Sequence, residues 1–223
     1  MRELRAWLDS VREIPLEGMA DFFAKRIGEY EAHMSPWAEA YRAIPGYLPP
    51  AASRLLDLGC GTGLELKEIF RKFPDVRVTG VDLCSAMLER LAEKFGERVE
   101  IVCGDYFDAP LGENYDAAVS VQSFHHFTPE QKETLFRRIY RALGRDGVFL
   151  ECDYVACCAE EEKLLARECE RKRAKEGISP DTFVHFDTPL TLAHEMRLLK
   201  DAGFRRVRAA GCFEGAALIR CEK

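Results

Sequence analysis

The sequence lacks the features that mark membrane, secreted or duplex-binding proteins. No apolar run approaches the roughly 20 residues that a membrane-spanning helix needs, and residues 1–9 carry charges where a secretory leader requires an unbroken apolar stretch. We therefore expect a cytoplasmic protein without a leader and without a membrane partner. Basic residues do not predominate, since 32 Lys and Arg stand against 38 Asp and Glu, for a net charge of −6. This balance argues against a dedicated duplex-binding protein, but it leaves open a brief encounter with a nucleic-acid substrate through a local patch.

The nine cysteines also lack the spacing of a zinc site or a disulfide framework. Their number is odd, and Cys152, Cys157, Cys158 and Cys169 do not form the C-x2-C pairs of structural zinc. A chain of this length buries about 70% of its unfolded surface, so it needs neither disulfides nor metal to hold a core. We expect reduced thiols that pack as small apolar side chains, and neither a bound metal nor an arsenic-type acceptor.

The hydrophobic pattern divides the chain into an N-terminal helical lid, residues 1–50, and a domain over residues 51–223. Apolar residues in the first part recur at three- and four-residue steps, as in amphipathic helices. In the second part, short apolar runs alternate with helical patterns, which predicts a parallel sheet covered by helices on both faces. A charge-rich helix at 159–176 lies in an expected insertion at about 155–190, followed by a helix at 190–202 and a hairpin around Gly211 and Gly215. The expected strands are 55–58, 76–81, 99–102, 117–121, 148–150, 204–210 and 216–221, and the helices between them are 64–73, 86–95 and 129–143.

A glycine loop after the first predicted strand is the most informative segment. Asp57-Leu-Gly-Cys-Gly-Thr-Gly63 ends an apolar strand, and a helix begins directly after it. Glycine permits a sharp turn and close approach of a ligand, and the helix offers free N–H groups that suit a carboxylate or phosphate. A dinucleotide G-x-G-x-x-G loop would place its third glycine at the position of Leu64, and no G-x-x-x-x-G-K-[ST] loop for a nucleoside triphosphate is present. The pattern D-x-G-x-G-x-G instead resembles motif I of the class I S-adenosylmethionine-dependent methyltransferases.

Acidic residues stand at the ends of the next two predicted strands. Asp82 follows the glycines by about 20 residues, where a carboxylate can accept both hydroxyls of a ribose. Leu83 and Met87 are suited to lie against a flat base, and Asp105 can accept a hydrogen bond from the exocyclic amine of adenine. Because ligands bind beyond the carboxyl ends of the strands in an open α/β sheet, we expect these residues to share one crevice.

The resemblance covers the chain from about residue 19 to residue 223 and is strongest over residues 54–151. It implies an α/β, Rossmann-like, doubly wound sheet of seven strands in the order 3-2-1-4-5-7-6, with strand 7 antiparallel. It also implies S-adenosylmethionine as the cofactor. The positions that it assigns to this cofactor are Asp57, Gly59, Cys60, Gly61 and Gly63 for the methionine portion and its loop, Asp82 for the ribose, Asp105 and Tyr106 for the adenine, and Val121 and Gln122 for the amino group.

Residues 22–30 are similar to the lid helix of small-molecule methyltransferases, including the quinone-biosynthesis group. In that interpretation Tyr30 closes over the cofactor. The same tyrosine at the edge of a helix's apolar stripe would need no ligand, so both interpretations stay open.

Histidines supply the candidates for acid–base chemistry. His125 and His126 lie just beyond the fourth predicted strand, where either could accept a proton from the methyl acceptor. A base is optional, because the sulfonium of the cofactor already activates the methyl group. The alternative to a catalytic role is a histidine that bonds to the backbone or packs beside the methionine portion of the cofactor. His185 lies in the predicted insertion and is a possible contact of the acceptor. Asp153 alone does not make the carboxylate cluster that a metal-dependent catechol acceptor requires.

These features predict a methyltransferase that acts by in-line transfer to an O, N or C nucleophile of a small molecule. The absence of Asn/Asp-Pro-Pro-Tyr/Phe after the fourth strand argues against an adenine amine or a glutamine amide as the nucleophile. A non-catalytic S-adenosylmethionine-binding protein and a transfer-RNA or protein methyltransferase are the alternatives. The residues that could form a basic strip for the latter are Arg167, Arg171, Lys172, Arg173 and Lys175, or Arg205, Arg206 and Arg208. The identity of the acceptor and the oligomeric state are not predicted.

Overall fold

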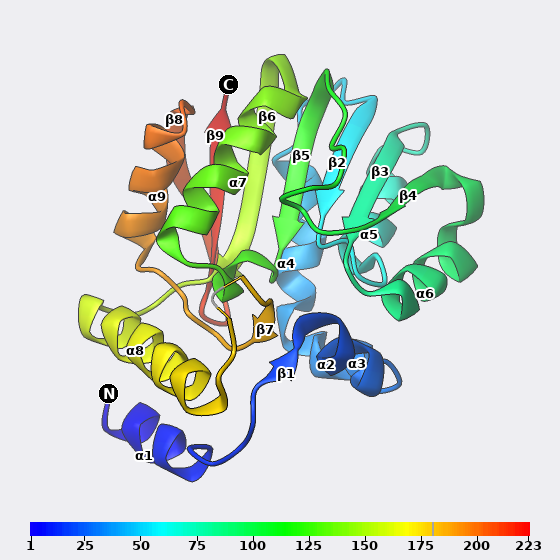
Figure 1. Ribbon diagram of the computed structural model, residues 1–223. Coiled ribbons are helices and arrows are strands. Elements are labelled where there is room, and N and C mark those ends of the chain that lie inside the picture. The colour runs from blue at the N-terminus through cyan, green and yellow to red at the C-terminus, as the bar shows by residue number, and fades with distance from the viewer. Residues whose placement is uncertain (180) are drawn as a thin grey trace.

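The computed structural model describes residues 1–179 and 181–223, and a seven-stranded sheet forms its centre (Figure 1). The strand order is β4-β3-β2-β5-β6-β9-β8, and β9 runs antiparallel to both β6 and β8. Counted along the chain within this sheet, the order is 3-2-1-4-5-7-6, so the predicted topology is confirmed. The strands are β2 (Arg54–Leu58), β3 (Arg77–Asp82), β4 (Val99–Cys103), β5 (Tyr115–Val121), β6 (Leu143–Tyr154), β8 (Arg205–Phe213) and β9 (Ala216–Glu222).

Helices cover both faces of this sheet, which explains why its strands are apolar on both sides. Leu55 of β2 packs into a cluster with side chains of the first group of helices, and the next residue, Leu56, packs into a second cluster with the other group. The first group comprises α4 (Ala38–Ala43), α5 (Leu64–Lys72) and α6 (Ser85–Phe95). The second group comprises α7 (Pro129–Ala142) and α9 (Leu192–Asp201).

The N-terminal segment is less regular than predicted. It consists of α1 (Arg2–Ser10), β1 (Glu17–Gly18), α2 (Met19–Arg26), α3 (Tyr30–His33) and the short 3-10 helices η1 (Ser35–Trp37) and η2 (Ile44–Gly46). The expected continuous lid helix over residues 22–30 is wrong, because a turn at 27–29 separates α2 from α3. Gly28 lies in that turn, where glycine's low helix propensity favours a break.

The insertion connects back to the N-terminal segment. Its long helix is α8 (Ala159–Glu176), and α1 packs against it through Leu8 and Leu165. Further along, β7 (Val184–His185) pairs antiparallel with β1, with His185 opposite Glu17. The two-residue strands are too short to show any period, so this second sheet is invisible in the sequence.

Element ends differ from the predictions in a few places. Gly211 lies inside β8, so the expectation that it forms the hairpin turn is wrong; the turn is Glu214 and Gly215, both with positive φ. Thr191 caps α9 by accepting the N–H of His194, which starts this helix two residues later than expected. The remaining 3-10 helices are η3 (Gly96–Arg98) and η4 (Phe124–His126). No helix in the described part of the chain combines the length and the apolar character needed to cross a membrane.

Candidate active site

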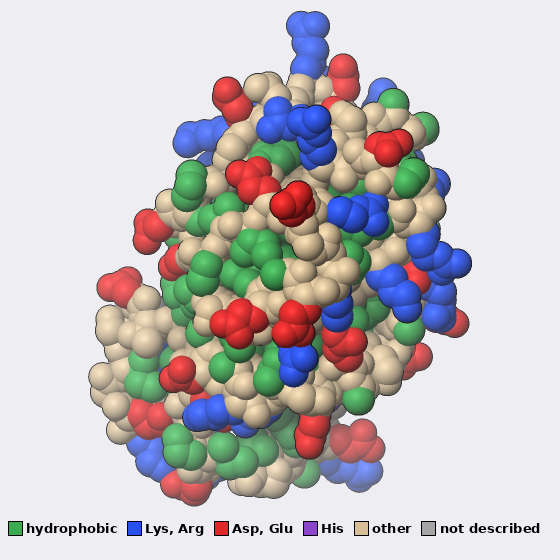
Figure 2. Space-filling model, turned by 90° about the vertical axis from the view of Figure 1, so that its right-hand side faces the viewer, with side chains coloured by type: hydrophobic (Ala, Val, Ile, Leu, Met, Phe, Trp, Pro, Cys, Tyr) green, Lys and Arg blue, Asp and Glu red, His purple; other side chains and the backbone are tan. Residues whose placement is uncertain are grey.

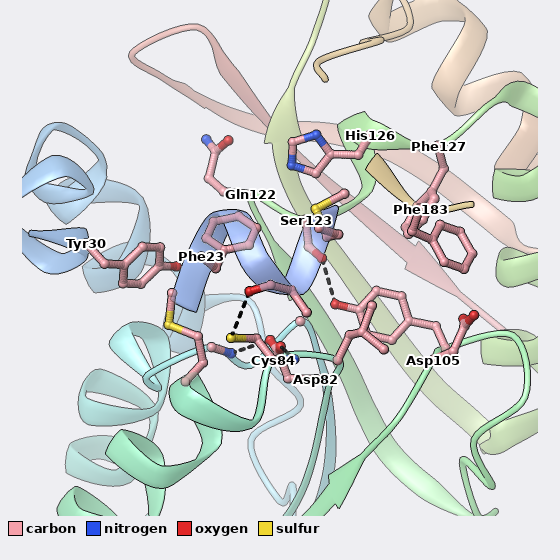
Figure 3. Close-up of a pocket in the computed structure, with 17 residues that line it drawn as sticks. Phe23, Tyr30, Asp82, Cys84, Asp105, Gln122, Ser123, His126, Phe127 and Phe183 are labelled. Atoms are coloured by element: carbon pink, nitrogen blue, oxygen red, sulfur yellow. Dashed lines mark hydrogen bonds between the residues drawn. The ribbon is translucent and has the colours of Figure 1, made fainter. Parts of the chain in front are cut away.

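A cavity lies at the carboxyl ends of β2 to β5, where the sequence predicts a shared crevice (Figure 3). This first cavity holds about 650 Å³ of empty space, part of it open solvent. The predicted residues that line it are Tyr30, Gly59, Gly61, Asp82, Leu83, Met87, Asp105, Tyr106, Gln122 and His126. Those that lie outside its wall are Asp57, Cys60, Gly63, Val121 and His125.

The glycine loop has no room for side chains at its two ends. Gly59 has φ +76°, and a Cβ there would lie 2.3 Å from Ser123 Oγ and 2.7 Å from the Tyr106 hydroxyl. Gly63 has φ +74°, and its Cβ would lie 2.6 Å from side-chain atoms of Leu91 and Phe95. Gly59 therefore keeps the first cavity open, whereas Gly63 lets α5 pack closely against α6.

Asp82 ties the second strand of the predicted site to the glycine loop. Its Oδ2 accepts the Gly61 N–H at 2.9 Å, and its Oδ1 accepts the Cys84 N–H at 2.8 Å. Burial raises the pKa of this carboxyl, and the N–H groups that it accepts offset only part of that rise. A carboxylate has about four lone-pair sites, so each oxygen retains an acceptor position for a ligand.

Two more carboxyl groups are buried behind the loop. Asp57 is fully buried, and neither of its oxygens has a hydrogen-bond partner among the described residues. Burial, together with the neighbouring carboxyls of Glu65 and Asp82, raises its pKa well above the usual range. Burial also raises the pKa of Glu65, in the first turn of α5, to about 8. Burial therefore disfavours the charged form of both carboxyls, and the Asp57 oxygens have acceptor capacity that the described residues do not use.

The far end of the first cavity is aromatic. The Tyr106 hydroxyl lies 3.0 Å from Ser123 Oγ, and Asp105 Oδ1 accepts the N–H of Phe107 at 2.8 Å. Lining residues that the sequence analysis missed are Met19, Ala20, Phe23, Cys84, Ser123, Phe127 and Phe183. Ser123 and Phe127 flank the histidine pair and could have been found there, but the others come from α2, the start of α6 and the insertion, and carry no motif.

A second cavity adjoins the first. It holds about 1120 Å³ of empty space, part of it open solvent, and shares Phe23, Tyr30, Gln122 and His126 with the first cavity. Its other lining residues are Phe22, Arg26, Glu29, His33, Met34, Trp37, His125, Tyr154, His185 and Asp187. Tyr30, the predicted lid residue, therefore lies between two cavities and does not simply close over one of them. Gln122 and His126 lie at the same boundary.

Gln122 has an unusual conformation at this boundary. Its φ is +52°, a left-handed value that costs a non-glycine residue about 1–2 kcal/mol. Its backbone N–H donates to the Cys152 carbonyl at 2.9 Å, and its buried Nε2 has no hydrogen-bond partner among the described residues. Strain together with an unused buried donor is typical of a ligand-binding position.

The histidine pair is held by Asp153 at the end of β6. His125 Nδ1 lies 2.5 Å from Asp153 Oδ1, while Asp153 Oδ2 accepts the N–H groups of Phe124 and His125. Burial lowers the pKa of His125, but the charge and hydrogen bond of Asp153 more than compensate, so the net shift is upward. Burial, His125 and His185 lower the pKa of His126 well below its usual value. The His126 imidazole is therefore neutral at pH 7.

His185 stacks on Phe22, with ring centroids 3.4 Å apart and planes 6° apart. His185 also lines the second cavity, so the insertion contributes to the wall of that space.

Four of the five basic side chains of α8 that the sequence offers for a basic strip make contacts within the chain. Lys172 is buried and donates to the carbonyls of Val11, Arg12 and Ile14, and Arg173 donates to backbone carbonyls of the insertion. Arg171 pairs with Glu168 and Lys175 pairs with Glu13. These four side chains therefore do not form a free basic strip, and Lys172 and Lys175 hold the N-terminal segment. On the face beside β4 and α6, acidic and basic side chains are interspersed (Figure 2).

Comparisons with known proteins agree with this geometry. Residues 55–147 match the model of a family described as "Methyltransferase domain". The malonyl-[acyl-carrier protein] O-methyltransferase of Priestia megaterium is 34% identical over 97 residues, which are 43% of this chain and 35% of that protein. The chain thus spans about a third of the length of the first curated relatives that it matches.

Two longer alignments extend the likeness. The carboxy-S-adenosyl-L-methionine synthase of Nautilia profundicola is 25% identical over 167 residues, covering 69% of this chain and 70% of that protein. The crystal structure of human N-acetylserotonin methyltransferase in complex with SAM superimposes with a TM-score of 0.64 at 20% identity, over 86% of this chain and 54% of that one. The structural likeness shows a shared fold.

Proposed function

We propose that this chain, whose residues 55–147 match the model of the methyltransferase-domain family, transfers a methyl group from S-adenosylmethionine to a small molecule in the second cavity. The observation that carries this proposal is the joining of two cavities. The glycine loop, Asp82 and Asp105 line the first, and Tyr30, Gln122 and His126 form a wall common to both.

The residues around the first cavity fit this cofactor. Asp82 keeps acceptor positions for the ribose hydroxyls, and Leu83 and Met87 offer apolar surface for the adenine. The unused acceptors of Asp57, behind the loop, together with Glu65 would favour the ammonium group of the methionine portion, because an arriving cation stabilises ionised carboxylates. When bound, the cofactor supplies a methyl group already activated by its sulfonium.

The protein's contribution to the reaction is positioning and exclusion of water. Phe23 and Tyr30 cover the boundary between the cavities, and the free Nε2 of Gln122 can donate to an oxygen of the acceptor. His126 is neutral and reaches both cavities, so it can take a proton from an acceptor hydroxyl. His125 lines only the second cavity, and its Nδ1 is already engaged by Asp153.

A transfer-RNA or protein substrate is less consistent with the structure. Most of the basic residues on α8 that could contact a phosphate backbone make internal contacts, and Arg206 pairs with Glu222. A role limited to cofactor sensing would leave the second cavity, with its strained Gln122, without a purpose. We therefore favour an enzyme with a small acceptor.

Isothermal titration calorimetry with S-adenosylmethionine and S-adenosylhomocysteine tests the first half of this proposal, with NAD and ATP as control ligands. We expect one site for each S-adenosyl compound and none for the controls. No heat from either S-adenosyl compound at 1 mM would refute the assignment. Transfer of label from methyl-labelled cofactor into small-molecule fractions of an extract tests the second half. Label that enters only RNA or protein would contradict the small acceptor.

A further inference from the structure

Three potential metal ligands converge on the wall of the second cavity. One donor atom each from His125, His126 and Asp187 lies within 4.8 Å of the other two. Asp187 Oδ1 is 3.6 Å from His125 Nε2 and 3.4 Å from His126 Nδ1. Ligand atoms bonded at about 2.0–2.1 Å to one metal ion stand roughly 3.0–3.4 Å apart, so small side-chain movements would bring these atoms into one coordination sphere.

The protein orients this cluster from outside. Asp153 binds His125 Nδ1 at 2.5 Å, which leaves Nε2 as the free nitrogen and directs it toward Asp187. Thr188 donates its N–H to the His125 carbonyl at 2.7 Å, which holds the Asp187 segment against the histidine loop. A carboxylate behind a ligating imidazole is the usual outer support of a protein metal site.

The cluster is not satisfied by its own contacts. At 3.6 and 3.4 Å, neither imidazole makes a proper hydrogen bond to Asp187. His126 Nδ1 has one long contact, 3.3 Å, to the Phe186 carbonyl. The Asp187 side chain is 40% exposed, so a hydrated ion can reach it from solvent.

We propose that His125, His126 and Asp187 form a binding site for a divalent transition-metal ion, with Zn²⁺ and Mn²⁺ as the probes. Two imidazoles and one carboxylate suit such ions, and three protein ligands leave coordination positions open toward the second cavity. The site departs from the expectation of a metal-free protein, because Asp187 is distant from the histidines in the sequence and only the insertion brings it to them.

The use of this ion rests on the proposed methyl transfer. An acceptor hydroxyl bound to the ion loses its proton to solvent near neutral pH. Its oxygen then forms the new O–C bond while the methyl–sulfur bond breaks and leaves its electron pair on sulfur. The ion thereby replaces His126 as the means of activating the acceptor, which restricts the substrate class to molecules with an oxygen nucleophile.

The test is metal binding measured without any cofactor. The purified protein is stripped with a chelator and titrated with ZnCl₂ and MnCl₂ by calorimetry, and Co²⁺ absorption reports the coordination geometry. Asp187→Asn is the main variant, since this side chain is partly exposed and accepts no hydrogen bond from the residues that the structure describes. His33→Gln is the matched control, because His33 lines the same cavity outside the cluster.

We expect one equivalent of metal on the wild type and on the His33 variant, with at least tenfold weaker binding by Asp187→Asn and by His126→Gln. Circular dichroism confirms that each variant is folded. Absence of binding to the wild type at 100 µM metal, or equal affinity of the wild type and Asp187→Asn, would overturn the proposal. S-adenosylhomocysteine titrated into the stripped protein separates the two proposals: metal binding without nucleoside binding leaves the metal site standing and removes the methyltransferase.

Discussion

Replacing Asp82 with asparagine tests the proposed cofactor site most directly. In the structure the carboxylate accepts two backbone N–H groups, from Gly61 and Cys84, one on each oxygen. The asparagine keeps one acceptor oxygen and presents an NH₂ group in place of the other. That NH₂ faces an N–H, so one backbone donor of the loop is left without a partner, and the position loses its negative charge.

The size of the effect follows from these contacts. The two ribose hydroxyls would donate to a carboxylate in the wild type and to a single neutral oxygen in Asp82→Asn. Loss of one hydrogen bond to a charged acceptor costs about 1.5–3 kcal/mol. Since every 1.4 kcal/mol is about tenfold in affinity, we expect S-adenosylhomocysteine to bind roughly 10- to 150-fold more weakly.

Calorimetric titration measures this change, and a thermal melt of each protein shows whether the fold has survived. Asp108→Asn is the control, because Asp108 is exposed, does not line the first cavity and makes no side-chain hydrogen bond among the described residues. Binding by Asp82→Asn within threefold of the wild type, in a folded protein, would refute the role of Asp82 in holding the ribose.

Three further predictions concern stability, each measured by urea unfolding. Gly63→Ala should lower the free energy of unfolding by about 2–5 kcal/mol, because the backbone is left-handed there and the new Cβ would lie 2.6 Å from two side-chain atoms of α6. Gly215→Ala should lower it by less, because Gly215 has a positive φ but open space around it. Equal losses in the two variants would contradict this reasoning. Lys132→Met should lower the free energy of unfolding by about 3–5 kcal/mol, because it leaves the Glu195 carboxylate, 2.8 Å away and 2% exposed, buried without its partner. The double variant Lys132→Met/Glu195→Met should recover most of that loss. No recovery would show that the ion pair is not the cause. The pKa of Glu65 is raised from 4.5 to about 8 in the folded protein, so its contribution to the free energy of unfolding is present at low pH and is lost as pH rises from 4.5 through 8. Glu65→Gln should flatten this part of the plot of unfolding free energy against pH. An unchanged slope would contradict the shift.

The sequence alone determined the sheet and the edge at which the first cavity lies. Strand–helix alternation, two-sided apolar strands and alternating glycines are local properties, since each depends on backbone conformation or on periodicity within a few residues. The sequence could predict that Asp82 and Asp105 share one crevice because the end of a parallel strand is a fixed point in this fold, and both line the first cavity. Asp57 and Gly63 belong to the same motif but lie behind the cavity wall, a difference that spacing cannot show.

Only the tertiary structure decided the second cavity and what surrounds it. The pairing of β1 with β7 brings His185 to the lid, and the insertion brings Asp187 to His125 and His126. The Lys172 ammonium, which the sequence offered as a contact for nucleic acid, instead donates hydrogen bonds to the carbonyls of Val11 and Ile14. These contacts join residues far apart in the chain through short or irregular segments without a period, so their positions arise from packing and not from any local pattern.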